Sequence, residues 1–259
     1  MDGETLENNR IDFLSEPAPF SMADEWFDMA KPDHFWFKWR FNALRKILPR
    51  DFIWGRCLEI GCGNATVIKQ IEDFYGCPVS GCDLNLSALK KSPQVNGNLF
   101  FYNINQRQAE FKERFNTIIL FDVLEHIKDI KYFLASVSFH LKENGQLIIN
   151  VPALESCYSK YDQVAGHFRR YSLSLLKKEL SLSAFEITGY SYWGLSMIPL
   201  LFIRKMMLNF YSRDYVIEKG FLPSNPLINF VLESMCLIEC AIFKKVPIGT
   251  SLMAIAKKE

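Results

Sequence analysis

The fold of this chain is constrained most by a strand, a glycine turn, a helix and a second strand that follow one another within residues 57–83. The first strand reads CLEI, the helix ATVIKQIEDFY and the second strand PVSGCD. Together they form a βαβ unit, in which a helix links two parallel strands. The alternation continues, and it predicts an α/β fold with a doubly wound, mostly parallel, seven-stranded Rossmann-like sheet. The five further strands are expected where β-branched and aromatic residues cluster, at 98–102, 117–121, 146–151, 185–192 and 251–256.

The chain is long enough for one domain with a sizeable core, because it has 259 residues of which 49% are hydrophobic. Residues 1–32 are mixed and contain prolines, so we expect an arm that lies over the domain rather than within its sheet. The domain is predicted at 33–257, and its first helix begins DHFWFKWRF with Asp33 as the expected N-cap. An apolar helical insertion at about 194–247 separates the last two strands and is expected to be a lid or substrate cap.

Charge and targeting signals argue against several classes of protein. The net charge of +1 gives no global attraction to nucleic acid, and no long basic tract is present to follow a phosphate backbone. The N-terminus is acidic and polar, unlike a secretory signal, and the seven cysteines include no Cys-x-x-Cys pair. We therefore expect a reduced, cytoplasmic protein that does not bind nucleic acid.

Two apolar runs in the insertion are too interrupted to span a membrane. GLSMIPLLFI is followed by Arg204 and Lys205, and PLINFVLESMCLIECAIF contains Glu233 and Glu239. Such runs can rest on a membrane surface, line an apolar pocket or bury a homodimer interface, and the sequence leaves these alternatives open. They also suggest a bulky or lipid-like substrate.

A nucleoside site is predicted at the glycine turn. Gly61 and Gly63 lack a Cβ, so backbone N–H groups at the start of the helix can approach a ligand closely. Asp83 ends the second strand, where a carboxylate accepts hydrogen bonds from ribose hydroxyls. The dinucleotide fingerprint fits poorly because Thr66 takes the place of its small third residue, and Glu59 suits a cationic amine better than a pyrophosphate.

With these motifs the chain resembles the class I S-adenosylmethionine-dependent methyltransferases from about Trp36 to Lys257. The segments GCD at 81–83 and LFDVLEHI at 120–127 are similar to the family's second and fourth motifs. The resemblance implies S-adenosylmethionine as cofactor and in-line transfer of its methyl group to a small or lipid-like acceptor. It also implies that Arg40 reaches the methionine carboxylate. The full set of implied cofactor contacts is Glu59, Gly61, Gly63, Asp83, Leu84, Asn103, Ile104, Arg40 and Phe121.

Within that set, Glu59 is expected to bind the cofactor's amino group, while Leu84 and Asn103 lie beside its adenine. Two positions depart from the family pattern. Ala65 replaces a third glycine that is common in such turns, and Asn103 stands where relatives often have aspartate. Alanine is small enough to keep the turn, and asparagine still offers a carbonyl oxygen to the adenine amine.

A hydroxyl or protonated amine must lose a proton when it is methylated, and the resemblance implies that the proton acceptor follows the fourth or the fifth of the seven predicted strands. Asp122, Glu125 and His126 follow the fourth strand, and the loop 152–171 follows the fifth. His126 is the first candidate base, since imidazole titrates near neutrality, and Asp122 is expected to shape the floor under the methyl group. The alternative is that Glu125 and His126 only hold the loop in place.

A second cluster, DQVAGHFRRY at 162–171, resembles the GHxRRY segment of one branch of these enzymes. His167 is the second candidate base. Arg169, Arg170 and Tyr171 are predicted to bind substrate, and the two arginines suit a carboxylate or phosphate. The structural alternative is an ion pair between one of these arginines and Asp162.

Other functions stay open beside the leading one. The residues Asp122, Glu125, His126 and His167 also form a ligand set for Mg²⁺, Mn²⁺ or Zn²⁺, similar to metal-dependent O-methyltransferases that act on RNA ends or quinone precursors. A non-catalytic module that binds S-adenosylmethionine is a further alternative. A nicotinamide oxidoreductase is disfavoured, because the Tyr-x-x-x-Lys at 215–219 falls inside the insertion and far from the expected strand end.

Overall fold

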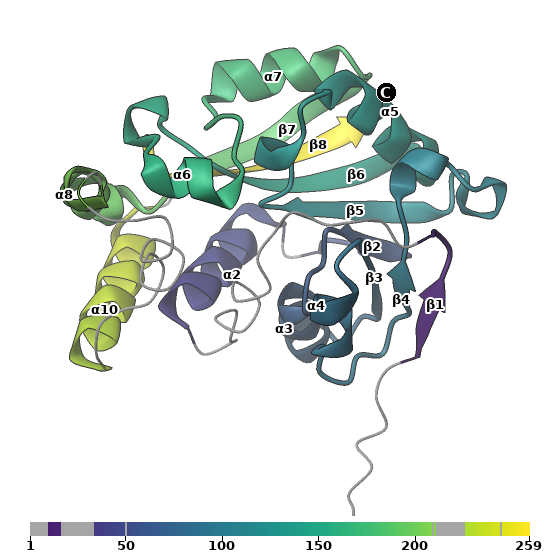
Figure 1. Cartoon of the computed structure of the whole chain (residues 1–259), viewed down its shortest axis with the longest axis horizontal. Coiled ribbons are helices and arrows are strands. Elements are labelled where there is room, and N and C mark those ends of the chain that lie inside the picture. Colours follow the sequence, from purple (N-terminus) through teal and green to yellow (C-terminus); the bar gives the residue numbers. More distant parts are fainter. Residues whose placement is uncertain (1–9, 17–33, 50, 209, 211–225, 244) are drawn as a thin grey trace, which may run out of the picture.

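The strands form one eight-stranded sheet in the order β1-β4-β3-β2-β5-β6-β8-β7 (Figure 1). The computed structural model describes residues 10–16, 34–49, 51–208, 210, 226–243 and 245–259. All seven strands expected from the sequence are present, which confirms the α/β class and the doubly wound, mostly parallel sheet. The strands are β1 (Ile11–Phe13), β2 (Cys57–Ile60), β3 (Val79–Asp83), β4 (Leu99–Phe101), β5 (Phe115–Phe121), β6 (Leu141–Pro152), β7 (Phe185–Trp193) and β8 (Ser251–Lys258).

The N-terminal arm supplies the eighth strand. β1 pairs in parallel with β4, so that Ile11 lies opposite Leu99 and Phe13 opposite Phe101. The expectation that the arm stays out of the sheet is therefore wrong for its described part. A three-residue edge strand is too short to show an alternating pattern, yet it pairs backbone groups that β4 would otherwise expose at an edge. Residues 1–9 and 17–33 lie outside the described residues.

The strand order reverses at β2. β3 and β4 lie on one side of it, and β5 and β6 on the other, all of them parallel. In such sheets a ligand binds at this switch point, beyond the carboxyl ends of the strands. β8 and β7 complete the sheet in antiparallel orientation, and the insertion connects them.

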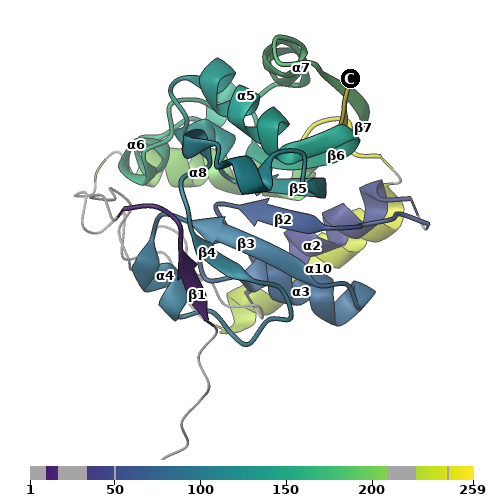
Figure 2. The same cartoon turned by 90° about the vertical axis from the view of Figure 1, so that its right-hand side faces the viewer.

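Helices cover both faces of the sheet (Figure 2). α5 and α7 lie on one face, and α2, α3 and α10 on the other. The helices are α2 (Phe35–Ile47), α3 (Thr66–Tyr75), α4 (Leu86–Lys90), α5 (Ile130–His140), α6 (Lys160–Ala165), α7 (Leu173–Ser181), α8 (Ile198–Leu208) and α10 (Pro226–Ile242). Short 3₁₀ turns are η1 (Ile104–Gln106), η2 (Ala109–Phe111), η3 (Leu124–His126), η4 (Glu155–Cys157) and η5 (Leu195–Met197).

Strand β5 shows how the core fixes the site. Its sequence FNTIILF is buried almost throughout, because alternate side chains enter the two apolar layers on opposite faces of the sheet. Ile118 and Leu120 belong to the cluster that includes α5 and α7, and Ile119 and Phe121 to the cluster that includes α2 and α3. Full burial of each such side chain contributes roughly 1.5–3 kcal/mol, so the end of this strand is held rigidly.

Helix α2 begins with an unexpected cap. His34 is the N-cap, and its Nδ1 accepts a hydrogen bond from the backbone N–H of Trp36 at 3.2 Å. The imidazole thus takes the role predicted for Asp33, which lies outside the described residues. Further along the helix, Trp39 is fully buried and packs near Trp193 of β7.

The described part of the insertion consists of η5, α8 and α10, followed by a non-helical end in which Val246 bridges Tyr192 of β7. α10 packs on α2, and Glu239 of α10 accepts hydrogen bonds from the backbone N–H groups of Gly194 at 2.7 Å and Ser196 at 2.9 Å. These bonds tie α10 to the first turn of the insertion. Among the described helices, none combines the length and the apolar character needed to cross a bilayer.

Candidate active site

A cavity of about 810 Å³ opens at the switch point of the sheet, at the carboxyl ends of β2, β3 and β5. Its other walls come from α2, from the segment 161–168 and from the start of the insertion. Every predicted cofactor residue lines it, and so do Asp122, Glu125, His126, His167 and Arg170. Residues predicted from separate motifs are therefore brought into one space.

The glycine turn and Asp83 form one end of the cavity. Gly61 and Gly63 have φ of +75° and +53°, a conformation that favours glycine, and a Cβ on Gly61 would meet Val123 at 2.6 Å. Asp83 accepts hydrogen bonds from the backbone N–H groups of Gly63 and Asn85, both at 2.7 Å. Burial raises the pKa of Asp83, although these bonds lower it. Ala65 also adopts a left-handed φ of +56°, so alanine preserves the turn with some strain.

Glu59 lies at the base of this turn, 2% exposed, and its Oε2 is buried without a hydrogen-bond partner. Burial raises its pKa to about 8, against the lowering effect of the Arg40 guanidinium. The carboxyl is therefore protonated at neutral pH in the free protein, and a cationic ligand group beside it would favour the ionised form. The residue therefore fits the ammonium group that the sequence led us to expect.

Asp122 connects the cavity floor to the core. It follows β5 with φ of +56°, accepts a hydrogen bond from Arg40 and accepts another from Asn150 Nδ2 at 2.7 Å. Asn150 Oδ1 in turn accepts from the Trp193 indole N–H at 2.9 Å. Arg40 also lies over the rings of Phe37 and Phe121, at 4.9 Å and 5.1 Å. Both oxygens of Asp122 are thus occupied, which suits a structural floor better than proton transfer.

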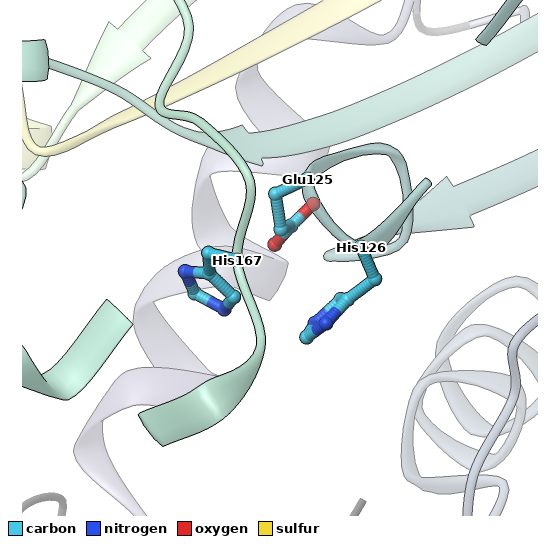
Figure 3. Close-up of side chains that lie close together, drawn as sticks. All are labelled: Glu125, His126 and His167. Atoms are coloured by element: carbon cyan, nitrogen blue, oxygen red, sulfur yellow. The ribbon is translucent and has the colours of Figure 1, made fainter. Parts of the chain in front are cut away.

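A carboxyl group and two imidazoles meet at the opposite side of the cavity (Figure 3). Glu125, His126 and His167 each offer a ligand atom, and these atoms all lie within 4.8 Å of one another. Both carboxyl oxygens of Glu125 are buried without a hydrogen-bond partner, and burial raises its pKa. Burial, with help from the nearby His167, lowers the pKa of His126 to about 3. His126 is therefore neutral and weakly basic.

His167 is oriented by a buried carboxylate, whereas His126 bonds the backbone of Gly166. Its Nδ1 lies 3.0 Å from Oδ1 of Asp162, a fully buried carboxylate that also accepts from Arg170 Nε at 2.8 Å. Burial opposes ionisation of Asp162, but the bonds from His167 and Arg170 lower its pKa to about 2. An ionised carboxylate only accepts hydrogen bonds, so the proton of a neutral His167 is on Nδ1 and its Nε2 carries a lone pair.

A profile of the methyltransferase domain family matches residues 33–215 of the chain. The chain belongs to this family. The match confirms the family predicted from the glycine turn, and it covers both Glu59 and the His167 segment.

Individual relatives of this methyltransferase are distant. The ubiquinone biosynthesis O-methyltransferase of Pelagibacter ubique is 26% identical over 144 residues, which cover 49% of this chain and 60% of the relative. The chain thus spans less than two thirds of that relative's length. An S-adenosylmethionine-dependent methyltransferase structure from Mesorhizobium loti superposes with a TM-score of 0.54 at 12% identity, covering 85% of this chain and 98% of that one. A phosphoethanolamine N-methyltransferase of Haemonchus contortus in complex with S-adenosyl-L-methionine gives 0.55 at 17% identity, over 91% and 57%. At these identities the two structures establish a shared fold.

Two of the three predicted substrate residues of this methyltransferase lie outside the main cavity. Arg169 pairs with Glu179 at 3.3 Å, and Tyr171 is 1% exposed with its hydroxyl donating to the Leu124 carbonyl at 3.4 Å. The sequence run GHFRRY suggested three neighbouring contacts, but in an extended segment successive side chains point to opposite sides, and only Arg170 lines the cavity. Arg170 itself is paired with Asp162, as the structural alternative predicted.

The histidines assigned to structure behave as expected. His140 donates from Nδ1 to the Ser136 carbonyl at 2.7 Å and lies 2.9 Å from the Tyr102 hydroxyl through Nε2, while His34 caps α2. Other cavity residues were not assigned to the site from the sequence. These are chiefly Tyr161 and Gln163 of α6, Met197 of η5, Leu201 and Arg204 of α8, and Thr250 and Ser251. Of these residues, Arg204 could have been suspected from the sequence, because it is a charged residue within an apolar segment.

Proposed function

We propose that this methyltransferase transfers the methyl group of S-adenosylmethionine to a hydroxyl group of a small aromatic acceptor, of the type that precedes a quinone. One observation carries the proposal: a single cavity joins the nucleoside end at Glu59 and Asp83 to the Glu125, His126 and His167 cluster. The relatives named ubiquinone biosynthesis O-methyltransferase support this class of acceptor.

The residues at the nucleoside end fit S-adenosylmethionine, which would supply a sulfonium-bound methyl group: the acceptor oxygen bonds to its carbon in line as the carbon–sulfur bond breaks, and S-adenosylhomocysteine leaves. Asp83 is positioned to accept hydrogen bonds from the ribose hydroxyls, and Glu59 to bind the amino group. Arg40 lines the cavity beside Phe121 and offers charge to the methionine carboxylate. The apolar walls exclude water, which would compete for the methyl group.

The acceptor hydroxyl has to lose a proton, and His167 is the better base of the two imidazoles. Asp162 holds its Nδ1–H, so Nε2 is free to take the proton, and the same carboxylate then stabilises the imidazolium. His126, with its pKa lowered to about 3, remains neutral and is better suited to orienting the acceptor or binding a metal.

A metal-assisted form of the same reaction is the second candidate, and the partnerless carboxyl of Glu125 beside two imidazoles favours it. Of the four predicted ligands, Asp122 is already occupied by Arg40 and Asn150, which leaves Glu125, His126 and His167. A divalent ion held there would act as a Lewis acid on the acceptor oxygen. Asp162 would orient His167 toward such an ion, because its carboxylate bonds the other ring nitrogen.

We infer a lipid-like acceptor and contact with a membrane surface from α8 and α10, the two helices of the insertion that the structure describes. The two acidic side chains of α10 add little free negative charge to its surface, because Glu233 pairs with Lys38 at 2.8 Å and Glu239 is buried. Exposed apolar side chains gathered on a helix indicate an interaction site, and the exposed Lys245 that follows α10 favours an anionic bilayer. The exposed side chains described on both helices are all apolar: Pro199, Leu200, Phe202, Ile203, Met206, Met207, Leu227, Ile228, Phe230, Val231, Leu237, Ile238, Ala241 and Ile242.

Flotation with phosphatidylglycerol vesicles, paired with measurement of the mass in solution, tests this surface. We expect a monomer that floats, and a Phe202→Ser, Met206→Ser double variant that stays in the dense fraction. Phe74→Ser, which removes an exposed aromatic on α3, is the matched control. A homodimer that buries the apolar surface and does not float would refute the lipid contact.

The activity test uses S-adenosylmethionine with a labelled methyl group and three acceptors: catechol, a catechol with an isoprenoid tail, and phenol as a comparison. We expect label in the catechols, with faster transfer to the tailed one, and formation of S-adenosylhomocysteine. Cofactor binding without any labelled product would instead support the non-catalytic module.

A further inference from the structure

Arg204 of α8 is a cation that the proposed reaction does not use. Its side chain lines the same cavity as His167, although it belongs to the apolar insertion. Its guanidinium carbon lies 3.9 Å from the ring centroid of Tyr161. Among the described residues, no carboxylate comes within ion-pair distance of it. Nη2 of Arg204 is buried and has no hydrogen-bond partner.

The other two arginines of the cavity are compensated. Arg40 is paired with Asp122, and Arg170 with Asp162 at 2.8 Å. Arg204 has no ion pair of this kind among the described residues: Asp162 acts on it only from beyond ion-pair distance and is already bonded by Arg170 and His167, and its bond to the Tyr161 side chain brings no counter-charge. A guanidinium stays charged in proteins even when burial lowers its pKa, as it does here. An unpaired charge in a partly desolvated site is costly unless a ligand of opposite charge completes it.

Arg204 also lies on the acceptor side of the cavity. Tyr161, on which it stacks, has its ring centroid 6.5 Å from that of His167, and His167 lies 4.7 Å from His126 by the same measure. Arg204 thus contacts Tyr161, whose ring lies near the candidate base His167. None of these ring contacts includes a residue of the nucleoside end. Met197 and Leu201 line the wall beside it, so the charge is set in apolar surroundings.

We propose that Arg204 binds an anionic group of the acceptor, a carboxylate or a phosphate, and thereby selects acidic acceptors over neutral ones. The proposal rests on the proposed function, because it assumes that the acceptor occupies this part of the cavity. A guanidinium suits such groups because its planar N–H donors match their oxygens in pairs. The Tyr161 ring holds the guanidinium plane by stacking.

The test measures binding rather than turnover, so it stands even if no methyl transfer is found. The probes are 3,4-dihydroxybenzoate, catechol and phenyl phosphate, each titrated calorimetrically into protein saturated with S-adenosylhomocysteine. We expect the carboxylate or the phosphate probe to bind at least tenfold more tightly than catechol. Of 3,4-dihydroxybenzoate and phenyl phosphate, the probe that binds more tightly shows whether the site prefers a carboxylate or a phosphate.

Arg204→Gln should remove that tenfold preference, and Arg204→Lys should keep part of it because the charge remains. Lys205→Gln is the matched control: Lys205 is the adjacent cation on the same helix, its Nζ donates to the Ser156 carbonyl, and it does not line the cavity. Unchanged binding of S-adenosylhomocysteine to Arg204→Gln would show that the variant folds. The proposal is overturned if wild-type protein binds catechol as tightly as both acids, if it binds neither acid, or if Arg204→Gln keeps the preference.

Discussion

Asp162 and His167 form a buried carboxylate–imidazole pair, with His167 Nδ1 3.0 Å from Asp162 Oδ1. Asp162 lies in the first turn of α6, and His167 follows the Gly166 C-cap, where the turn brings the imidazole back toward the carboxylate. The pair fixes which ring nitrogen of a neutral His167 carries the proton, and for this reason we propose His167 rather than His126 as the base.

Replacement of His167 by alanine should lower kcat by about 10²–10⁴, the usual contribution of a general base. His126→Ala should lower it less, because an imidazole whose pKa is about 3 is a poor base at neutral pH. Steady-state kinetics on the tailed catechol measures both, with calorimetric binding of S-adenosylhomocysteine as the folding control. Equal loss in the two variants would favour a shared metal site over a single base.

Metal removal distinguishes the metal-assisted reaction from the reaction in which His167 alone acts as the base. If Glu125, His126 and His167 hold a divalent ion, dialysis against a chelator should abolish turnover, and Mg²⁺, Mn²⁺ or Zn²⁺ should restore it. Glu125→Gln should weaken metal binding measured directly by calorimetry. Full activity after exhaustive chelation would refute the metal-assisted form.

Removal of the Asp83 carboxylate should weaken cofactor binding. Each hydrogen bond to a charged group contributes about 1.5–3 kcal/mol, so Asp83→Ala should raise the Kd for S-adenosylmethionine by at least tenfold. Part of this effect comes through Gly63, whose N–H loses its acceptor. Asp73→Ala, at an exposed ion pair with Lys69 on α3, is the control and should bind normally. An unchanged Kd in Asp83→Ala would contradict the assigned ribose contact.

Cofactor affinity should increase with pH because of Glu59. Its carboxyl is protonated below its pKa of about 8 in the free protein, yet only the carboxylate form pairs with an ammonium group. Binding below that pH must therefore expel a proton, so the Kd should fall as the pH rises toward 8 and level off above it. Glu59→Gln should bind weakly at every pH tested and lose this dependence. A pH-independent Kd in wild-type protein would contradict the assignment.

The Glu59 carboxyl should make the ligand-free protein less stable as the pH rises, although it makes cofactor binding tighter. The pKa of Glu59 is about 8 in the folded chain, above the 4.5 of a glutamate in the unfolded chain, so the folded state binds more protons between these values. The free energy of unfolding should therefore fall as the pH rises from 4.5 to 8. Glu59→Gln should reduce this slope in denaturant titrations, and a slope equal to that of wild-type protein would argue against a buried, protonated Glu59.

The sheet and the nucleoside end could be predicted because local sequence determines them. β2, the glycine turn and Asp83 lie within one short segment, and hydrophobic runs identify strands that are buried on both faces. The Arg204 contact could not be predicted in this way, since it depends on how α8 packs over α6. Tyr171 was misjudged for a related reason: alternate residues of an extended segment enter different environments, and sequence proximity to His167 does not reveal which.

The central claim, that this cavity binds S-adenosylmethionine through Glu59 and Asp83, is tested most directly by thermal unfolding with S-adenosylmethionine, S-adenosylhomocysteine, NAD or no ligand. Saturation at 100 times the Kd stabilises a protein by about 2.7 kcal/mol. We predict a clear rise in the Tm of wild-type protein with both adenosyl compounds, none with NAD, and a much smaller rise in Asp83→Ala and Glu59→Gln. An unchanged Tm with all ligands, or an equal rise with NAD, would contradict the account.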